Sequence, residues 1–197
     1  MHTLSQGFLQ RNQPENNLVR KEKTVGLLGA SFDPITTGHT QLILDGARMF
    51  DELHICMAVN PAKKYLLDEA QREDLVRTVV TDLRITGTPI HIHVLKNRLL
   101  VHLGLELGVT HLLRGVRDFM DFSYESKLAA KNQQLAPAIR TVYLTLPELN
   151  GVSSSSVKGI FGLEGWEAIV APDVHPRVLD ALKRKHLAKQ AAEGGWA

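Results

Sequence analysis

Residues 29–39 combine small, hydroxyl-bearing and imidazole side chains in a pattern suited to binding phosphate. They read Gly-Ala-Ser-Phe-Asp-Pro-Ile-Thr-Thr-Gly-His and follow an apolar run at 24–28. Apolar residues at helical spacing come next, from Leu42 to Phe50. A buried strand, a turn and a helix with His39 in its first turn are therefore expected. In such a layout backbone N–H groups and the helix dipole attract an anion, and His39 can hydrogen-bond a phosphoryl oxygen.

The same pattern occurs in α/β proteins that bind no nucleotide, so the turn alone does not assign a function. It contains neither the Gly-Lys-Ser/Thr of a P-loop nor the Gly-x-Gly-x-x-Gly of dinucleotide-binding folds. Kinase-like and dinucleotide-dependent enzymes are accordingly disfavoured.

Two clusters of cationic side chains follow later strand-like runs. Lys63 lies in the segment Asn-Pro-Ala-Lys-Lys at 60–64, where its ammonium can reach a phosphate or merely coat the surface. Arg114 and Arg117 lie three apart around a glycine, directly after His-Leu-Leu, at an expected strand-to-helix junction. Their guanidinium groups suit bidentate phosphate binding, while Glu125 on the next helix is placed to accept from a ribose or a base.

A run of serines with a nearby lysine forms a third cluster. Ser153, Ser154, Ser155 and Ser156 open a further expected helix, and Lys158 follows one turn on. One serine is enough for an N-cap, so four hydroxyl groups with first-turn N–H groups indicate a second anion-binding site. Together the clusters favour a polyphosphate ligand and phosphoryl or nucleotidyl transfer, which depends on positioning and charge more than on a covalent nucleophile.

No metal cage is expected among the remaining chemically active residues. His91 and His93 alternate along a strand and are expected to face cross-strand neighbours rather than a metal. Cys56 lies in an apolar strand, which indicates a buried thiol and not a nucleophile. We expect Mg²⁺ to arrive with the nucleotide, because it seldom uses a dedicated protein cage.

The elements that must position these clusters alternate along the chain. Strand-like runs are expected at 24–30, 52–59, 89–95, 110–113 and 140–146, and helices at 38–50, 68–82, 98–107 and 118–135. A further helix opens near 151–158, and a last one starts at Pro172. This alternation predicts an α/β fold, a doubly wound, Rossmann-like parallel sheet with helices on both faces. Ligands of such sheets bind beyond the carboxyl ends of the strands, where all the clusters are expected.

Composition places the chain among ordinary soluble proteins. Of its 197 residues 44% are hydrophobic and 22% charged, and the formal net charge is +2, which favours neither a nucleic-acid nor a membrane partner. We expect one domain at 24–187, a polar, flexible extension at 1–23 and a C-terminal tail at 188–197. The single cysteine fits a reducing compartment, and no apolar run approaches the ~20 residues of a membrane span. A cytoplasmic protein is therefore predicted.

From about Thr24 to His186 the chain resembles the bacterial phosphopantetheine adenylyltransferases of the nucleotidylyltransferase superfamily. The Thr-x-Gly-His at 36–39 and the serine run mark the superfamily in general. The block formed by Arg-Gly-Val-Arg-Asp (114–118), Asp-Phe-Ser-Tyr-Glu (121–125) and Asn132 is typical of this member. The resemblance implies transfer of the adenylyl group from ATP to 4′-phosphopantetheine, giving dephospho-coenzyme A and pyrophosphate without a covalent intermediate.

The resemblance also implies a role for each matching residue. The catalytic residues would be His39, Lys63 and Arg114, with His39 stabilising the transition state at the α-phosphate. The acceptor side would be formed by Ser31, Lys63, Leu100, Arg114 and Asn132. The ATP site would be formed by Ser31, Phe32, His39, Gly115, Val116, Arg117, Glu125, Ser153, Ser154, Ser155 and Lys158. Mg²⁺ bound with ATP is the implied cofactor, coenzyme A a product-like inhibitor and a homo-hexamer the implied assembly.

The chain departs from the family pattern in a shortened segment, in the basic stretch at 96–98 with His102, and in the polar extension of 23 residues, and two other functions remain open. The segment 146–151 is one residue shorter than usual, and His102 stands where Asp or Asn is usual. One alternative is an adenylyltransferase that acts on nicotinate or nicotinamide mononucleotide, since those relatives share the Gly-His turn and a serine motif. The other is a non-catalytic regulator that binds a nucleotide or coenzyme A, although the presence of His39, Lys63 and Arg114 argues against it.

Overall fold

The computed structural model describes residues 22–146 and 151–193. Most of the extension at 1–23, the end of the tail at 194–197 and residues 147–150 of the shortened loop lie outside this range. The proposed domain boundaries therefore stay predictions.

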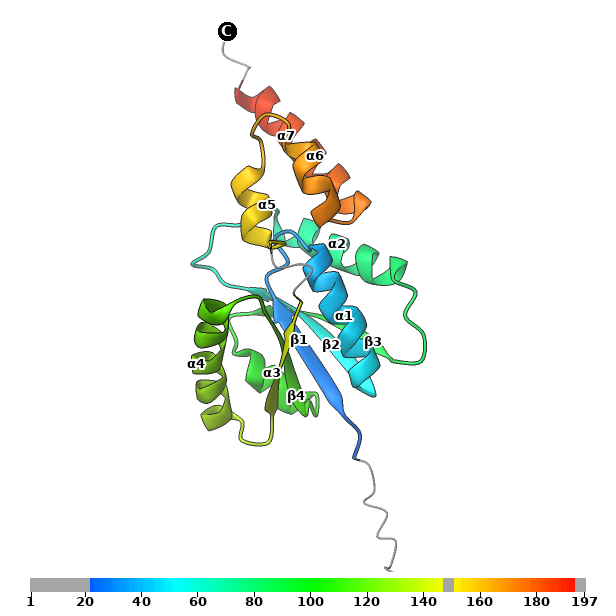
Figure 1. Ribbon diagram of the computed structural model, residues 1–197, viewed down its shortest axis with the longest axis vertical. Coiled ribbons are helices and arrows are strands. Elements are labelled where there is room, and N and C mark those ends of the chain that lie inside the picture. The colour runs from blue at the N-terminus through cyan, green and yellow to red at the C-terminus, as the bar shows by residue number, and fades with distance from the viewer. Residues whose placement is uncertain (1–21, 147–150, 194–197) are drawn as a thin grey trace, which may run out of the picture.

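The centre of the fold is a five-stranded sheet in the order β3-β2-β1-β4-β5 (Figure 1). Its strands are β1 (Val25–Ala30), β2 (Glu52–Val59), β3 (Ile90–Lys96), β4 (His111–Val116) and β5 (Arg140–Thr145). All neighbouring strands pair in parallel, and the expected doubly wound, Rossmann-like fold is confirmed. Because the chain runs outward from β1 to β3 and then returns to β4, the strand order reverses between β1 and β4.

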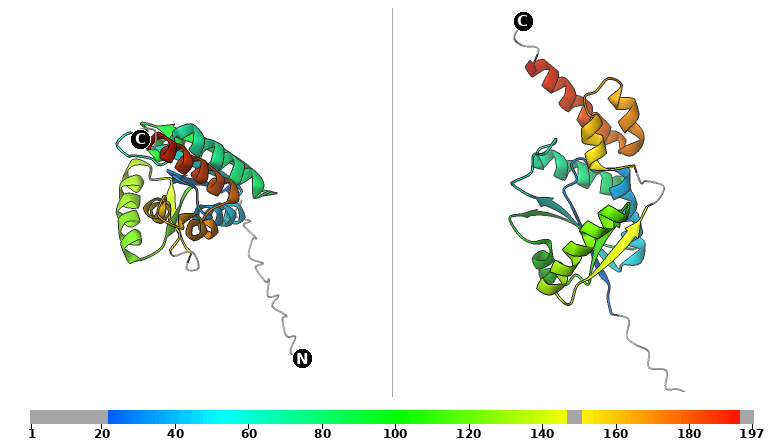
Figure 2. Two further views of the ribbon diagram at one scale, coloured as in Figure 1. Left: turned by 90° about the horizontal axis from the view of Figure 1, so that it is seen from above. Right: turned by 60° about the vertical axis from the view of Figure 1, so that its left-hand side comes forward.

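Helices cover both faces of this sheet and one of its ends. They are α1 (Thr37–Met49), α2 (Glu69–Asp82), α3 (Leu100–Glu106), α4 (Phe119–Leu135), α5 (Ser154–Ile160), α6 (Trp166–Val170) and α7 (Pro176–Glu193), with a 3-10 turn η2 (Ala171–Asp173). The last three helices form a group beyond one end of the strands (Figures 1 and 2). Within the described ranges, none of the helices is long and apolar enough to cross a membrane.

Two apolar clusters hold the layers together, one on each face of the sheet. The larger joins Leu28 of β1 to Ile43 of α1 and Val76 of α2, and the smaller joins Leu27 of β1 to Val101 of α3. Successive side chains of a strand point to opposite faces, so β1 is buried on both sides. Each fully buried aliphatic side chain of this kind contributes about 1.5–3 kcal/mol.

A glycine near the carboxyl end of β1 lets a helix approach the strand closely. A Cβ at Gly29 would lie only 2.4 Å from Cδ2 of Leu100, the first residue of α3. A side chain at this position would push α3 away from the strand, so the glycine fixes how closely the second helical layer packs.

The predicted elements differ from the structure mainly at their ends. Strand β4 continues to Val116 beyond the expected end at 113, because residues 114–116 pair in register with β5. Arg114 therefore lies on the strand and not after it. The last helix begins at Pro176 rather than Pro172 because η2 comes first, and it continues through 188–193, which we had assigned to the tail. The prediction also lacks the short helix α6.

Candidate active site

A cavity of about 350 Å³ lies at the carboxyl ends of β1 and β4, where the strand order reverses. Doubly wound sheets bind their ligands at such a position. The cavity is bordered by the ends of these strands and by the starts of α1, α4 and α5. Its lining includes Ser31, His39, Lys63, Arg114, Gly115, Val116, Arg117, Asp121, Glu125, Ser153, Ser154 and Ser155. Most of the residues predicted for the site are thus brought together.

His39 lies in the first turn of α1, where the fold fixes one nitrogen of its ring. The backbone N–H of Thr36 donates to His39 Nδ1 at 3.2 Å, and Thr36 Oγ1 lies 2.9 Å from the same nitrogen. The ring of buried Phe32 packs against the imidazole, with the two centroids 5.0 Å apart. Because a backbone N–H can only donate, Nδ1 accepts and the neutral ring has its proton on Nε2.

The surroundings of His39 favour the uncharged imidazole. Burial, and then the positive charge of Arg117, lower the pKa of His39 from 6.5 to about 4. Near neutral pH the ring is therefore uncharged. Among the described residues none forms a hydrogen bond with Nε2, so this N–H is available to an anion in the cavity.

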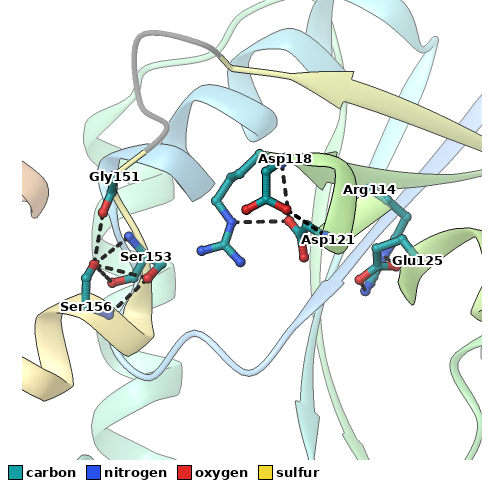
Figure 3. Close-up of polar contacts among 8 residues, drawn as sticks. Arg114, Asp118, Asp121, Glu125, Gly151, Ser153 and Ser156 are labelled. Carbon is teal, nitrogen blue, oxygen red and sulfur yellow. Dashed lines mark hydrogen bonds and ion pairs between the residues drawn. The ribbon is translucent and has the colours of Figure 1, made fainter. Parts of the chain in front are cut away.

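Arg114 and Glu125 hold each other in the wall of the cavity (Figure 3). Arg114 Nε donates to Glu125 Oε2 at 2.7 Å and an amino group donates to Oε1 at 2.6 Å, while the other amino group donates to the carbonyl of Gly29 at 2.8 Å. Three of the five N–H donors of the guanidinium are thereby engaged, and two remain. Glu125 is therefore paired with the arginine, whereas the sequence had indicated a carboxylate free for a ribose or a base.

Arg117 is bound to the start of α4 through the Nε side of its guanidinium and through its backbone N–H. Its Nε donates to Asp121 Oδ2 at 3.2 Å, and its backbone N–H donates to the same oxygen. Asp121 is itself fixed, since its N–H donates to the side chain of the N-cap residue Asp118 at 2.8 Å (Figure 3). Across the described ranges the two terminal amino groups of Arg117 form no hydrogen bond, which leaves them open to a ligand.

The serine run opens α5 as predicted, but its hydroxyl groups serve different purposes. Ser153 and Ser156 form a reciprocal capping box, and Ser156 Oγ also donates to the carbonyl of Gly151 (Figure 3). Ser154 Oγ donates to the carbonyl of Pro34 at 2.8 Å and so joins α5 to the turn after β1. Ser155 also lines the cavity, and its hydroxyl forms no hydrogen bond within the part of the chain that the structure covers.

Lys63 lines the cavity from the loop between β2 and α2. The residue is exposed and forms no ion pair with any described carboxylate. Ser31 follows β1 directly and lines the cavity as expected. The site therefore collects cationic groups from the loop after β2, from β4 and from the start of α4.

Three other predicted site residues are not among those that line the cavity. Phe32 is buried beneath His39, and Leu100 packs against the backbone of Gly29. Asn132 lies on α4 beyond Glu125 in the chain direction. None of the three belongs to the lining of the cavity among the described residues.

Lys158 pairs with a buried carboxylate and is not among the residues that line the cavity, so its role at the anion-binding site stays a prediction. Its Nζ donates to Asp33 Oδ2 at 3.2 Å, and the Asp33 side chain is fully buried. Because a buried carboxylate requires a compensating charge, Lys158 neutralises Asp33 and stays out of the cavity lining.

Asp33, Tyr65 and Arg72 were not predicted as site residues. They do not line the cavity but hold segments that do. Arg72 has a readable signal, because it lies at i, i+3, i+4 and i+7 with Leu75, Val76 and Val79, on the apolar stripe of α2. A charged residue on such a stripe indicates a buried charge. Asp33 and Tyr65 carry no comparable signal.

Comparisons with known proteins agree with this geometry. Residues 27–160 match the family model described as cytidylyltransferase-like. A protein of Neisseria meningitidis serogroup C named phosphopantetheine adenylyltransferase is 37% identical over 164 residues, covering 83% of this chain and 92% of the relative. A protein of the same name from Streptococcus suis is 40% identical over 135 residues, covering 68% and 81%.

Solved structures resemble the chain in fold. The nicotinic acid mononucleotide adenylyltransferase of Plasmodium falciparum, complexed with NaAD, superimposes with a TM-score of 0.62. The match covers 84% of this chain and 97% of that chain at 15% sequence identity. At this identity the likeness supports the Rossmann-like fold alone.

Proposed function

The chain belongs to the cytidylyltransferase-like family, among its phosphopantetheine adenylyltransferases, and we propose on this basis that it transfers the adenylyl group of ATP to 4′-phosphopantetheine. The products are dephospho-coenzyme A and pyrophosphate. The main structural support for nucleotidyl transfer is the set of side chains around one cavity, at the point where the strand order reverses. The set consists of a neutral donor, His39, and three cations, Lys63, Arg114 and Arg117.

The transfer is an in-line displacement at the α-phosphorus of ATP. A phosphate oxygen of phosphopantetheine forms a new bond to that phosphorus, and the bond from the phosphorus to the α,β-bridging oxygen breaks. Negative charge increases on the non-bridging α-oxygens and on the departing pyrophosphate. Preorganised donors stabilise this charge without a covalent intermediate. His39 Nε2–H is such a donor, since the bond from Thr36 to Nδ1 fixes both the tautomer and the ring.

The fixed cations divide between the two substrates. Lys63 and the two remaining N–H donors of Arg114 bind the phosphate of the acceptor, and Glu125 holds the guanidinium plane in the orientation that this requires. Arg117 and the start of α5 at Ser155 bind the β- and γ-phosphates of ATP. These assignments place the reacting oxygen and phosphorus between His39 and Lys63.

Mg²⁺ would enter with ATP, whose phosphates would supply most of its ligands. In the described ranges no three His, Cys, Asp or Glu residues are grouped to hold a metal ion. The two carboxylates of the cavity, Asp121 and Glu125, each face an arginine. When bound, the ion neutralises phosphate charge. A hexameric assembly, inhibition by coenzyme A and a cytoplasmic location stay expectations from the resemblance.

Pyrophosphate release from Mg-ATP tests the proposal. Three reactions run side by side, with 4′-phosphopantetheine, with nicotinate mononucleotide and with no acceptor. Release with phosphopantetheine alone, with dephospho-coenzyme A identified by mass, is the expected result. Release with the mononucleotide alone assigns the chain to the related dinucleotide-forming activity. ATP binding without release in any reaction indicates a regulator and contradicts the proposal.

A further inference from the structure

Arg72 is a buried cation with no carboxylate partner in the described part of the chain. Its side chain is 1% exposed, and its Nε has no hydrogen-bond acceptor among the described residues. Two contacts compensate for this burial. An amino group of Arg72 donates to the carbonyl of Ser31 at 2.8 Å, and the guanidinium carbon lies 3.9 Å from the centroid of the Tyr65 ring. Burying an unpaired charge is costly, so Arg72 is stable only where it keeps both contacts. The guanidinium therefore fixes the positions of the Ser31 carbonyl and the Tyr65 ring relative to each other.

Tyr65 closes the loop that contains Lys63. The backbone N–H of Asn60, at the start of the loop, donates to the Tyr65 hydroxyl at 2.7 Å. Inside the loop, Asn60 Oδ1 accepts from the N–H of Ala62 at 2.9 Å, and the carbonyl of Asn60 accepts from the N–H of Lys63 at 3.0 Å. The phenol thus joins the two ends of the segment 60–65, and Lys63 lies between them.

The chain after Tyr65 is anchored independently. The buried carboxylate of Asp33 accepts the backbone N–H groups of Leu66 and Leu67, each at 2.9 Å. These bonds fix the end of the loop but do not reach the segment 60–65. Lys63 itself is exposed. Among the contacts of the described residues, the Tyr65 hydroxyl and ring therefore add the restraint on this segment that the short turn bonds from Asn60 to Ala62 and Lys63 do not supply.

We propose that Tyr65, held by Arg72, is a positioning residue that sets the place of Lys63 beside the cavity. The same Arg72 holds the backbone of Ser31 on the opposite side, so one buried guanidinium fixes the spacing between two walls of the site. The inference rests on the proposed function, in which the Lys63 ammonium meets the acceptor phosphate. A displacement of about 1 Å at such a group can cost about 10²-fold in rate.

Substitutions at Tyr65 separate the two contacts. Tyr65→Phe keeps the ring on Arg72 and loses the hydroxyl, so kcat/KM for phosphopantetheine falls about 2- to 10-fold, the scale of one net hydrogen bond. Tyr65→Leu loses the ring as well, and we expect a fall of about 30-fold or more. The KM for ATP stays within about twofold in both variants, because Lys63 contacts the acceptor.

A double-mutant cycle distinguishes positioning from general damage. In a Lys63→Ala background, Tyr65→Phe has no further effect on kcat/KM, since there is no ammonium left to position. A full effect of Tyr65→Phe in that background, or an effect on ATP alone, overturns the proposal.

Amide hydrogen exchange tests the loop without using activity. Tyr65→Phe is expected to speed exchange in residues 60–65 and to leave 66 and 67 unchanged, because Asp33 still holds them. Unchanged exchange at 60–65 refutes the positioning role whatever the acceptor is. If the wild type fails to use phosphopantetheine while exchange responds as expected, the proposed function fails and the loop anchor stands.

Arg72 has a matched control on the same helix. Arg72→Lys loses the planar stack on Tyr65, so its kcat/KM resembles that of Tyr65→Leu. Arg77→Lys changes an exposed arginine of α2 that forms an ion pair with Glu73, and it leaves kcat/KM unchanged. Circular dichroism and the thermal midpoint verify that each variant is folded. Equal kinetics for Arg72→Lys and the wild type contradict the part assigned to Arg72.

Discussion

Two regions, one beside the end of the sheet and one on its strands, contain histidines with lowered pKa values, yet only the first is arranged as a site. Near the carboxyl end of β1, His39 Nδ1 accepts a hydrogen bond from a backbone N–H, and the ring borders a cavity. On β2 and β3, His54 Nδ1 lies 2.8 Å from His93 Nε2, and Glu52 Oε1 lies 3.0 Å from His54 Nε2 and 3.3 Å from His91 Nε2. In the second cluster these nitrogens lie against other members of the same cluster.

This comparison separates desolvation from function. Burial is the largest cause that lowers the pKa of His39, His54 and His93 alike. A lowered pKa therefore marks removal from water and does not by itself indicate catalysis. The features that distinguish His39 are its place in the first turn of a helix, the cavity that its ring lines and the cations around the same cavity.

The largest expected effect comes from removing the cavity histidine. His39→Ala is expected to lower kcat by about 10²–10³-fold, the scale of losing one preorganised transition-state donor, with little change in ATP affinity. His93→Ala, the matched change in the strand cluster, leaves kcat within about twofold. Steady-state kinetics with both substrates provide the measurement. Equal kcat values for His39→Ala and the wild type are incompatible with the role assigned to His39.

A smaller effect is expected from Arg114. Arg114→Ala raises the KM for phosphopantetheine about 10- to 100-fold, because charge-assisted hydrogen bonds to the acceptor phosphate are lost. Arg114→Lys restores little of it, since an ammonium cannot bind Glu125 and a phosphate with the same planar geometry. If the KM for ATP rises instead and that for the acceptor stays constant, the assignment of the two substrates to Arg114 and Arg117 is reversed.

The smallest effect concerns stability and belongs to the strand cluster. His54 and His93 have lowered pKa values in the folded state, so the unfolded chain binds protons more readily as pH falls through about 6.5. The free energy of unfolding is therefore expected to decrease from about pH 7.5 to about pH 5.5. Glu52 does not oppose this, because its lowered pKa makes it titrate below its ordinary value of 4.5.

Urea unfolding at the two pH values measures this decrease in the free energy of unfolding. Two variants show how much of the decrease comes from each group of histidines. His93→Gln removes the contribution of the strand cluster's outer histidine, and His39→Gln removes that of the cavity, which has the same sign. Lys23, which pairs with Glu52, and Arg77 also face the cluster. A protein as stable at the lower pH as at the higher contradicts the assignment of uncharged, desolvated histidines.

Local patterns in the sequence are sufficient to predict most of the fold and the neighbourhood of the site. Alternating apolar runs predict the five strands, because a buried parallel strand needs a continuous apolar segment. The positions of His39, Lys63 and the serine run follow from the rule that ligands bind where parallel strands end. Each of these signals lies within a few consecutive residues.

Pairings between distant segments could not be predicted in the same way. Lys158 and Asp33 are 125 residues apart, and no local pattern indicates that the lysine neutralises a buried carboxylate. The strand character of Arg114 depends on its register with β5, which forms only when the sheet assembles. The end of β4 and the partner of Lys158 are therefore tertiary properties, so the predicted end of β4 is wrong and the pairing of Lys158 with Asp33 could not be predicted.

The most direct test of the account is the protonation of His39 itself. Nitrogen-15 NMR of the imidazole, assigned with His39→Gln, reports both the pKa and the nitrogen that bears the proton. The account predicts a pKa of about 4 and a proton on Nε2 throughout the neutral range. A pKa close to the ordinary value of 6.5 would contradict the desolvated environment assigned to His39, and a proton on Nδ1 would remove the Nε2–H donor on which the proposed mechanism depends.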